Sequence, residues 1–165
     1  MTINDQRAEQ VDFSDPYYYT SGAFIAPKSA DFAIPDGLDG KILGVQGSTT
    51  HSAYARQALA DTGVEIKIYE KQEQVNRDLL AGRIDLLLAD QIAMGEFLER
   101  DEAKNLEIKK VAPRHPAFGE GIGIGIREDD DELESQINAA IKAVLENGTC
   151  TELSKKYFGQ DICGA

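Results

Sequence analysis

The stretch that decides the fold is I-D-L-L-L-A-D, residues 84–90, which is apolar at almost every position before its closing aspartate. Such a run is typical of a strand that is buried on both faces of a parallel sheet. A helical pattern of apolar residues precedes it at 73–81, and another follows it at 92–100. The alternation of strand and helix therefore predicts an α/β fold with a parallel sheet.

The same alternation extends along the chain in both directions. The further segments are a strand at 41–45, a helix at 50–61, a strand at 64–68 and a strand at 106–111. Pro113 and Pro116 then end the regular pattern. Residues 27–116 are therefore predicted to form one complete α/β lobe.

Two flanking segments, 1–26 and 117–165, carry apolar faces of their own. The second contains G-E-G-I-G-I-G-I-R at 119–127, a predicted strand whose glycine face lets another backbone approach closely or lets the strand bend. An amphipathic helix follows at 133–145, and a short helix comes after it. The flanks are too small to form a second complete core unaided, so their apolar faces need a partner. We therefore expect either an oligomer, such as a dimer, or a loosely folded flank.

Composition restricts the class of function. Hydrophobic residues make up 42% of the chain and charged residues 28%, as in a folded globular protein, and no run reaches the ~20 apolar residues of a membrane span. The formal net charge of −12 argues against nucleic-acid binding. The first ten residues, M-T-I-N-D-Q-R-A-E-Q, lack the pattern of a signal peptide. So acidic a surface is compatible with a cationic ligand, although solubility alone explains it.

The cysteines Cys150 and Cys163 both lie near the end of the chain. A disulfide between them would stabilise the fold by ~3 kcal/mol and would suit an oxidising compartment, but two free thiols fit the sequence nearly as well. Neither a metal site nor a bound cofactor is expected. Cysteine and histidine do not cluster, and the glycines of 119–127 do not open a helix as a dinucleotide motif does.

Polar residues stand where two of the predicted strands end. V-Q-G-S-T-T, residues 45–50, joins a strand to a helix, and its hydroxyl groups would be donors to a carboxylate there, although simple N-capping is the commoner role. Asp90 follows the buried strand and would accept a hydrogen bond from an ammonium group, unless it merely caps the next helix. Ligands of open α/β sheets bind at the carboxyl ends of strands, so the two groups are expected at one edge, where together they match an α-amino acid.

Arg7 is a weaker candidate when it is judged by its surroundings alone. Arginine binds carboxylates through a bidentate fork, but a lone arginine in a polar segment is usually only solvated. His51 and His115 have no visible nucleophile partner, so neither is assigned a catalytic role.

Five segments of the chain match a known pattern in order and spacing. They are M-T-I-N-D-Q-R-A-E-Q-V-D-F-S-D-P-Y-Y (1–18), L-D-G-K-I-L-G-V-Q-G-S-T-T (38–50), A-G-R-I-D-L-L-L-A-D (81–90), F-G-E-G-I-G-I-G-I-R-E-D-D (118–130) and N-G-T-C-T-E-L-S-K-K-Y-F-G (147–159). Together they resemble the periplasmic polar amino-acid-binding proteins of ABC transporters, solute-binding protein family 3. The resemblance covers essentially the whole chain and is nearest to the branch that binds lysine, arginine, ornithine, histidine and opines.

The resemblance implies a fold like that of type II periplasmic binding proteins, in which two α/β lobes enclose a ligand and are joined by two hinge strands, here near 21–26 and 119–124. It assigns 27–116 to a complete second lobe. Residues 1–26 and 117–165 would be parts of the first lobe. Family members carry about another lobe's worth of sequence before the segment that begins at Met1, so the chain is expected to be truncated at its N-terminus.

The resemblance also implies a ligand-binding site. The residues that match the family's binding positions are Arg7, Thr2, Ser48, Thr49, Thr50 and Asp90. Arg7 would clamp the ligand carboxylate, with help from the backbone at Thr2 and from Thr49, and Asp90 would accept from the α-ammonium group. The remaining two residues would line the pocket.

The expected function is that of a periplasmic, non-enzymatic component of an ABC importer that captures a basic amino acid or an opine and delivers it to permease subunits. One alternative is an enzyme on the same scaffold, similar to cyclohexadienyl dehydratase, which would need a general acid that does not stand out here. Another is a sensor module of a receptor kinase or ion channel, which would need transmembrane segments beyond this chain. The last is a fragment without binding activity, because half of an enclosing cleft loses contacts and water exclusion together.

Overall fold

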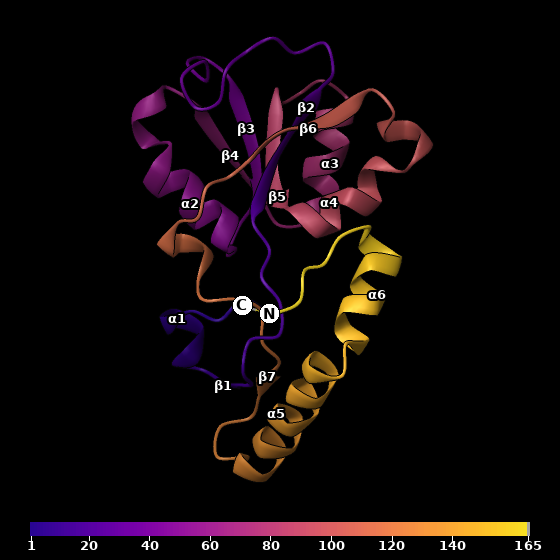
Figure 1. Ribbon diagram of the computed structural model, residues 1–165. Helices are drawn as coiled ribbons and strands as arrows, with labels where there is room; N and C mark the ends of the chain where they lie inside the picture. Colours follow the sequence, from indigo (N-terminus) through magenta and orange to yellow (C-terminus); the bar gives the residue numbers. More distant parts are fainter. Residues whose placement is uncertain (165) are drawn as a thin grey trace. The chain divides into compact units, whose positions relative to one another are not determined.

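The apolar run at 84–90 forms β5 (Leu86–Asp90), the middle strand of a five-stranded sheet of order β4-β3-β5-β2-β6 (Figure 1). The structure is a computed structural model, and it describes residues 1–164. Leu86, Leu87 and Leu88 are all fully buried. Successive side chains of a strand point to opposite faces, so their burial means that both faces of the sheet are covered, as the run predicts.

The strand directions correct the expectation of a parallel sheet. The other strands of this sheet are β2 (Gly22–Pro27), β3 (Ile42–Gln46), β4 (Glu65–Tyr69) and β6 (Leu106–Val111). β3 pairs in parallel with β4 and β5, but β2 lies between β5 and β6 and is antiparallel to both, so the sheet is mixed. The sequence does not reveal this, because a strand buried on both faces has the same composition whichever way it runs.

The helices predicted between the strands are confirmed, with small shifts at their ends. They are α2 (Thr50–Ala58), α3 (Gln72–Leu80) and α4 (Gln91–Leu98). α2 ends earlier than predicted because the chain tightens there into the 3-10 turn η1 (Ala60–Thr62) before Gly63, whose φ is 75°. Further 3-10 turns are η2 (Asp101–Ala103) and η3 (Pro116–Phe118).

Different helices cover the two faces of the sheet. α3 and α4 pack on one face, where Val75, Leu79 and Phe97 share a buried cluster with Leu87 of β5. α2 packs on the other face, where the ring of Tyr54 meets Phe24 of β2 edge-on, with the ring centroids 6.4 Å apart. The middle strands are thus enclosed between helices, and only loops and strand ends remain open to a ligand.

The chain divides into two compact units. The sheet unit is Ser21–Ala117, and the terminal unit consists of Met1–Thr20 together with the chain from Phe118 onward. β2 belongs to the sheet unit, whereas the division expected from the sequence, after residue 26, places most of this strand with the first flank.

The terminal unit is built from short strands and longer helices. Its elements are α1 (Asp5–Ala8), β1 (Asp12–Phe13), β7 (Gly125–Ile126), α5 (Asp131–Glu146) and α6 (Thr149–Phe158). β1 and β7 pair antiparallel, so only the end of the strand predicted at 119–127 is a strand. The backbone leaves the strand path earlier in that segment, because Gly119 and Gly121 have φ values of 70° and 134°.

The glycine face of this segment packs against other backbone, as predicted. A Cβ atom on Gly123 would lie 3.0 Å from the carbonyl oxygen of Ser14 and 2.9 Å from the side chain of Ile3. The two segments are also hydrogen-bonded: the N–H of Ser14 donates to the carbonyl of Ile124 at 3.0 Å, and the Ile124 N–H donates to Ser14 Oγ at 2.9 Å. Close backbone approach therefore explains the glycine at position 123.

One carboxylate of the sheet unit collects three donors and predicts a pH dependence. Asp78 of α3 accepts from the hydroxyl of Tyr69 at 2.7 Å, from Arg83 at 3.0 Å and from Lys67 at 3.1 Å. The Tyr69 hydroxyl, followed by Arg83 and Lys67, holds the pKa of the Asp78 carboxyl well below its usual range. A depressed pKa in the folded state stabilises the fold above the unfolded-state pKa of about 4, and this contribution is lost as the pH falls below that value.

We therefore expect Asp78→Asn to weaken the acid sensitivity of the sheet unit. Its urea unfolding midpoint should fall relative to the parent chain at pH 7, and the difference between the two should shrink as the pH is lowered from 5 to 2. Asp101→Asn is the matched control, because that side chain is 93% exposed and forms a surface ion pair with Lys104. A constant difference across this pH range would contradict the prediction.

Candidate functional site

The two polar groups predicted at strand ends lie at one edge of the sheet. β3 and β5 are parallel neighbours, with Leu43 opposite Leu86, so their carboxyl ends point the same way. α2 begins after a short loop at 47–49 that follows the first of these strands, and α4 begins directly after the second. Each helix N-terminus carries unpaired N–H groups and partial positive charge, so the edge combines donors with the carboxylate of Asp90.

Thr49 is the N-cap of α2. Its Oγ1 accepts from the N–H of Ser52 at 3.1 Å and donates to the carbonyl of Gln46 at 2.7 Å. The Ser52 side chain in turn accepts from the Thr49 N–H at 3.4 Å, which completes a capping box. The capping role considered for this loop is therefore present, and a ligand carboxylate would compete with Gln46 for the hydroxyl proton of Thr49.

The residues on either side of Thr49 differ in exposure. Ser48 is exposed and has a φ of 56°, a left-handed conformation that costs a non-glycine residue on the order of 1 kcal/mol. Backbone strain of this kind is often found where a side chain or N–H group is held for a ligand. Thr50 is 6% exposed and starts the helix beneath it. Ser48 is therefore the hydroxyl of this loop that is open to solvent.

Asp90 caps α4 with one of its two carboxylate oxygens. Oδ1 accepts from the N–H groups of both Ile92 and Ala93, each at 2.9 Å. Within residues 1–164, Oδ2 has no hydrogen-bond partner in the structure, so its lone pairs remain for another donor. The capping role and a ligand-binding role of Asp90 are thus compatible, because they use different oxygens.

The start of α4 is also tied to the point where the chain enters the sheet. The N–H of Gln91 donates to the carbonyl of Ser21 at 2.9 Å, and Gly22 lies opposite Asp90 in the antiparallel β2–β5 pair. The sequence did not indicate Ser21 as a neighbour of Asp90, because the antiparallel direction of β2 was not predictable from composition.

Arg7 and Thr2 belong to the terminal unit, and the structure brings them into contact. Arg7 Nη1 donates to the carbonyl oxygen of Thr2 at 2.9 Å, and Asn4 caps α1 by accepting from the Arg7 N–H at 3.0 Å. The bond to Thr2 takes one of the five N–H donors of the Arg7 guanidinium group, and the Arg7 side chain is half-buried. The backbone of Thr2 therefore orients a cation that is suited to binding a carboxylate.

Among the described residues, no group of three or more His, Cys, Asp or Glu side chains is placed to hold a metal ion. No helix in residues 1–164 has the length and apolar character needed to cross a membrane.

The amino-acid sequence and the structure of this chain are both similar to those of known solute-binding proteins. Residues 1–160 match the family described as bacterial extracellular solute-binding proteins, family 3. The L-arginine-binding protein of Pseudomonas aeruginosa is 38% identical over 100% of this chain and 65% of its own length. The lysine/arginine/ornithine-binding periplasmic protein of Escherichia coli is 34% identical over 99% of this chain and 64% of its own length. The chain thus spans about 65% of the length of these relatives.

A solved structure confirms the expected periplasmic-binding-protein type of fold, apart from the strand directions corrected above. An ancestral arginine-binding protein bound to arginine superposes with a TM-score of 0.82 at 29% identity, covering 96% of this chain and 69% of that protein. The family match, the two relatives and the shared fold all extend over nearly the whole chain. The chain therefore belongs to family 3 of the bacterial extracellular solute-binding proteins.

Proposed function

We propose that this chain carries ligand-binding elements of the solute-binding component of an ABC importer, and that its ligand is a basic amino acid or an opine. The observation that carries the proposal is the open Oδ2 of Asp90, at the same sheet edge as the N-terminus of α2. A carboxylate beside a helix N-terminus offers an acceptor for an ammonium group and donors for a carboxylate group. An α-amino acid carries both groups.

Each proposed binding residue has a separate role in the proposal. Asp90 accepts from the α-ammonium group, and the exposed Ser48 donates to the ligand beside the capped N-terminus of α2. Arg7 clamps the carboxylate through the donors that its bond to Thr2 leaves over. Thr49 assists at the same carboxylate, and Thr50 lines the pocket from beneath. In this proposal, the sheet unit is a complete lobe and the terminal unit is part of the other lobe.

The relatives support the choice of ligand and of setting. Both relatives described above are named for binding arginine, one of them together with lysine and ornithine, and the second is named as periplasmic. We accordingly place the protein in the periplasm, as a binding component without enzymatic activity, with the permease subunits of the importer as partners. The net charge of −12 agrees with attraction of a cationic ligand.

Calorimetric titration tests the proposal. The chain, checked for folding by circular dichroism, is titrated with arginine, lysine, ornithine, histidine, glutamine and octopine. We expect saturable binding of at least one basic ligand and none of glutamine. A folded chain that binds none of the six would overturn the proposal for this chain and would favour the alternative of a fragment without binding activity.

The apolar surface of the terminal unit supports a further proposal about assembly. The exposed large apolar residues on α5 and α6 are Leu133, Val144, Leu153, Tyr157 and Phe158. Exposed apolar side chains of this kind favour association, so we expect two copies of the chain to associate through this surface. Light scattering over a range of concentrations measures this, and a monomer at all concentrations would contradict it.

A further inference from the structure

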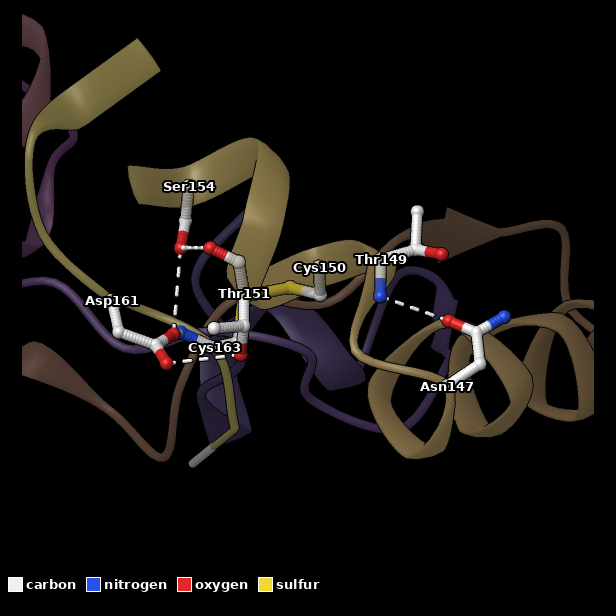
Figure 2. The surroundings of a disulfide bond; sticks show 7 residues. All are labelled: Asn147, Thr149, Cys150, Thr151, Ser154, Asp161 and Cys163. Carbon is white, nitrogen blue, oxygen red and sulfur yellow. Dashed lines mark hydrogen bonds between the residues drawn. A yellow bond between two sulfur atoms is a disulfide. The ribbon is translucent and has the colours of Figure 1, made fainter. Parts of the chain in front are cut away.

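Cys150 and Cys163, whose pairing the sequence left undecided, form a disulfide that ties the residues after α6 back to that helix. Cys150 lies in the first turn of that helix, and Cys163 follows the helix after a turn at Gly159, whose φ is 69° (Figure 2). We call residues 159–164 the C-terminal segment. Both cysteines are only half-buried, so a small thiol can reach the bond.

A carboxylate supports the same connection. Asp161 accepts from the hydroxyl of Thr151 at 2.9 Å, from the N–H of Cys163 at 3.1 Å and from the hydroxyl of Ser154 at 3.4 Å. Figure 2 shows these donors gathered around the Asp161 side chain, next to the disulfide. The C-terminal segment is therefore held against α6 by one covalent bond and by two hydrogen bonds, from Thr151 and Ser154, that both depend on the Asp161 side chain.

The segment held in this way pairs with the segment that leads into the sheet unit. Cys163 and Tyr18 form an antiparallel bridge, and the N–H of Gly164 donates to the carbonyl of Tyr17 at 3.0 Å. Tyr18 is bridged in turn to Ile122, whose N–H donates to the Tyr18 carbonyl at 2.8 Å. The C-terminal segment is thus hydrogen-bonded to one side of the segment at 17–18, while Ile122 is bonded to its other side.

These contacts are weak without the covalent bond. The bridges between these segments are isolated pairs and do not extend into ladders. A single hydrogen bond contributes about 1 kcal/mol net, which is less than the cost of ordering the residues of an untethered segment. The disulfide removes most of that cost, because it fixes Cys163 beside α6 before the bridge to Tyr18 forms.

The position of the bridge gives it a structural consequence beyond the chain end. Tyr18 lies two residues before Thr20, where the terminal unit ends, and the sheet unit starts at Ser21. The carbonyl of Ser21 accepts the N–H of Gln91, the residue after Asp90. The segment that the disulfide helps to order is therefore the same segment that passes from one unit into the other.

We propose that the Cys150–Cys163 disulfide is a redox-sensitive tether that keeps the C-terminal segment paired with Tyr17 and Tyr18 and so orders the first connection between the two units. A dithiol is the reductant: its two sulfur atoms form a disulfide while the Cys150–Cys163 bond breaks. Two electrons and two protons pass to the protein, leaving two cysteine thiols. This inference does not depend on the identity of the ligand.

Hydrogen exchange resolved by residue tests the tether. The exchange of the N–H groups of Tyr17, Ile122 and Gly164 is measured in the intact chain with and without dithiothreitol, and thiol titration confirms that reduction is complete. We expect protection at these positions to fall on the order of 100-fold on reduction, the effect of losing a short disulfide loop. The N–H groups of β5 serve as the internal reference and should keep their protection.

Two variants make the test specific. The double variant Cys150→Ser with Cys163→Ser should reproduce the reduced behaviour without any reductant. Asp161→Asn keeps the disulfide and should retain most of the protection at Tyr17 and Ile122. Unchanged protection after full reduction would overturn the proposal. Two other results would also overturn it. An equal loss of protection in Asp161→Asn would mean that the carboxylate holds the segment, and a loss of protection throughout β5 would mean that reduction affects the whole fold.

Discussion

Asp90→Asn is expected to weaken binding of a basic amino acid by about 30-fold or more, while leaving the fold intact. Removing one partner of a desolvated charge pair costs about 2–5 kcal/mol, because the ammonium group of the ligand is left without its counter-charge. Asparagine still offers an oxygen to the N–H groups of Ile92 and Ala93 and is as good an N-cap as aspartate. The variant therefore separates the two roles that the two oxygens of Asp90 combine.

The measurement is a calorimetric Kd for arginine, paired with a thermal unfolding midpoint for each protein. Asp61→Asn is the matched control, because it makes the same change of charge in the same unit, in the turn η1 beyond the far end of α2. We expect the control to bind like the parent chain. Unchanged affinity of Asp90→Asn for arginine would mean that Asp90 is not part of the site. A large fall in the unfolding midpoint of this variant would mean that Asp90 serves only as the helix cap.

Leu87→Ala is expected to destabilise the sheet unit by about 2–5 kcal/mol. Leu87 is fully buried in the middle strand, where it is paired with Gly44 on one side and Ile25 on the other. Its side chain belongs to the cluster formed with α3 and α4, so the truncation leaves a cavity between the sheet and these helices. Domains of this size are stable by about 5–15 kcal/mol, so the expected loss is a large part of the total.

Urea unfolding followed by circular dichroism measures this loss. Leu80→Ala is the matched control: the same substitution is made on α3 at a side chain that is 38% exposed, and we expect a change of less than about 1 kcal/mol. Similar midpoints for the two variants would mean that β5 is not the centre of the core.

The sequence predicts the elements of the sheet unit better than it predicts their directions. The strand predicted at 106–111 is β6 (Leu106–Val111), because it begins and ends on an apolar residue and Pro113 stops the pattern shortly after it. The insertion of β2 between β5 and β6 was not predicted, since pairing partners are chosen by the packing of the whole sheet. The strand predicted at 119–127 shrinks to β7, because the same glycines that permit close approach also permit the backbone to turn.

The sequence indicates two polar residues at the sheet edge, but not which of their atoms already form hydrogen bonds. Strand ends and helix starts indicate Thr49 and Asp90, and the structure makes both of them N-caps at one sheet edge. Which carboxylate oxygen of Asp90 takes the capping bonds depends on a side-chain rotamer, on which composition and spacing carry no information. The pairing of Cys150 with Cys163 was undecided for a similar reason, because it requires the chain to turn back at Gly159.

The ends of the sheet unit meet within the sheet itself. The N–H of Ala112 donates to the carbonyl of Gly22 at 2.8 Å, so the strand that enters the unit and the strand that leaves it are neighbours. A folded unit whose two ends are adjacent can be inserted into a surface loop of an unrelated protein without separating the two ends of that loop. We therefore expect residues 21–117 to be transferable as one folded unit into such a loop.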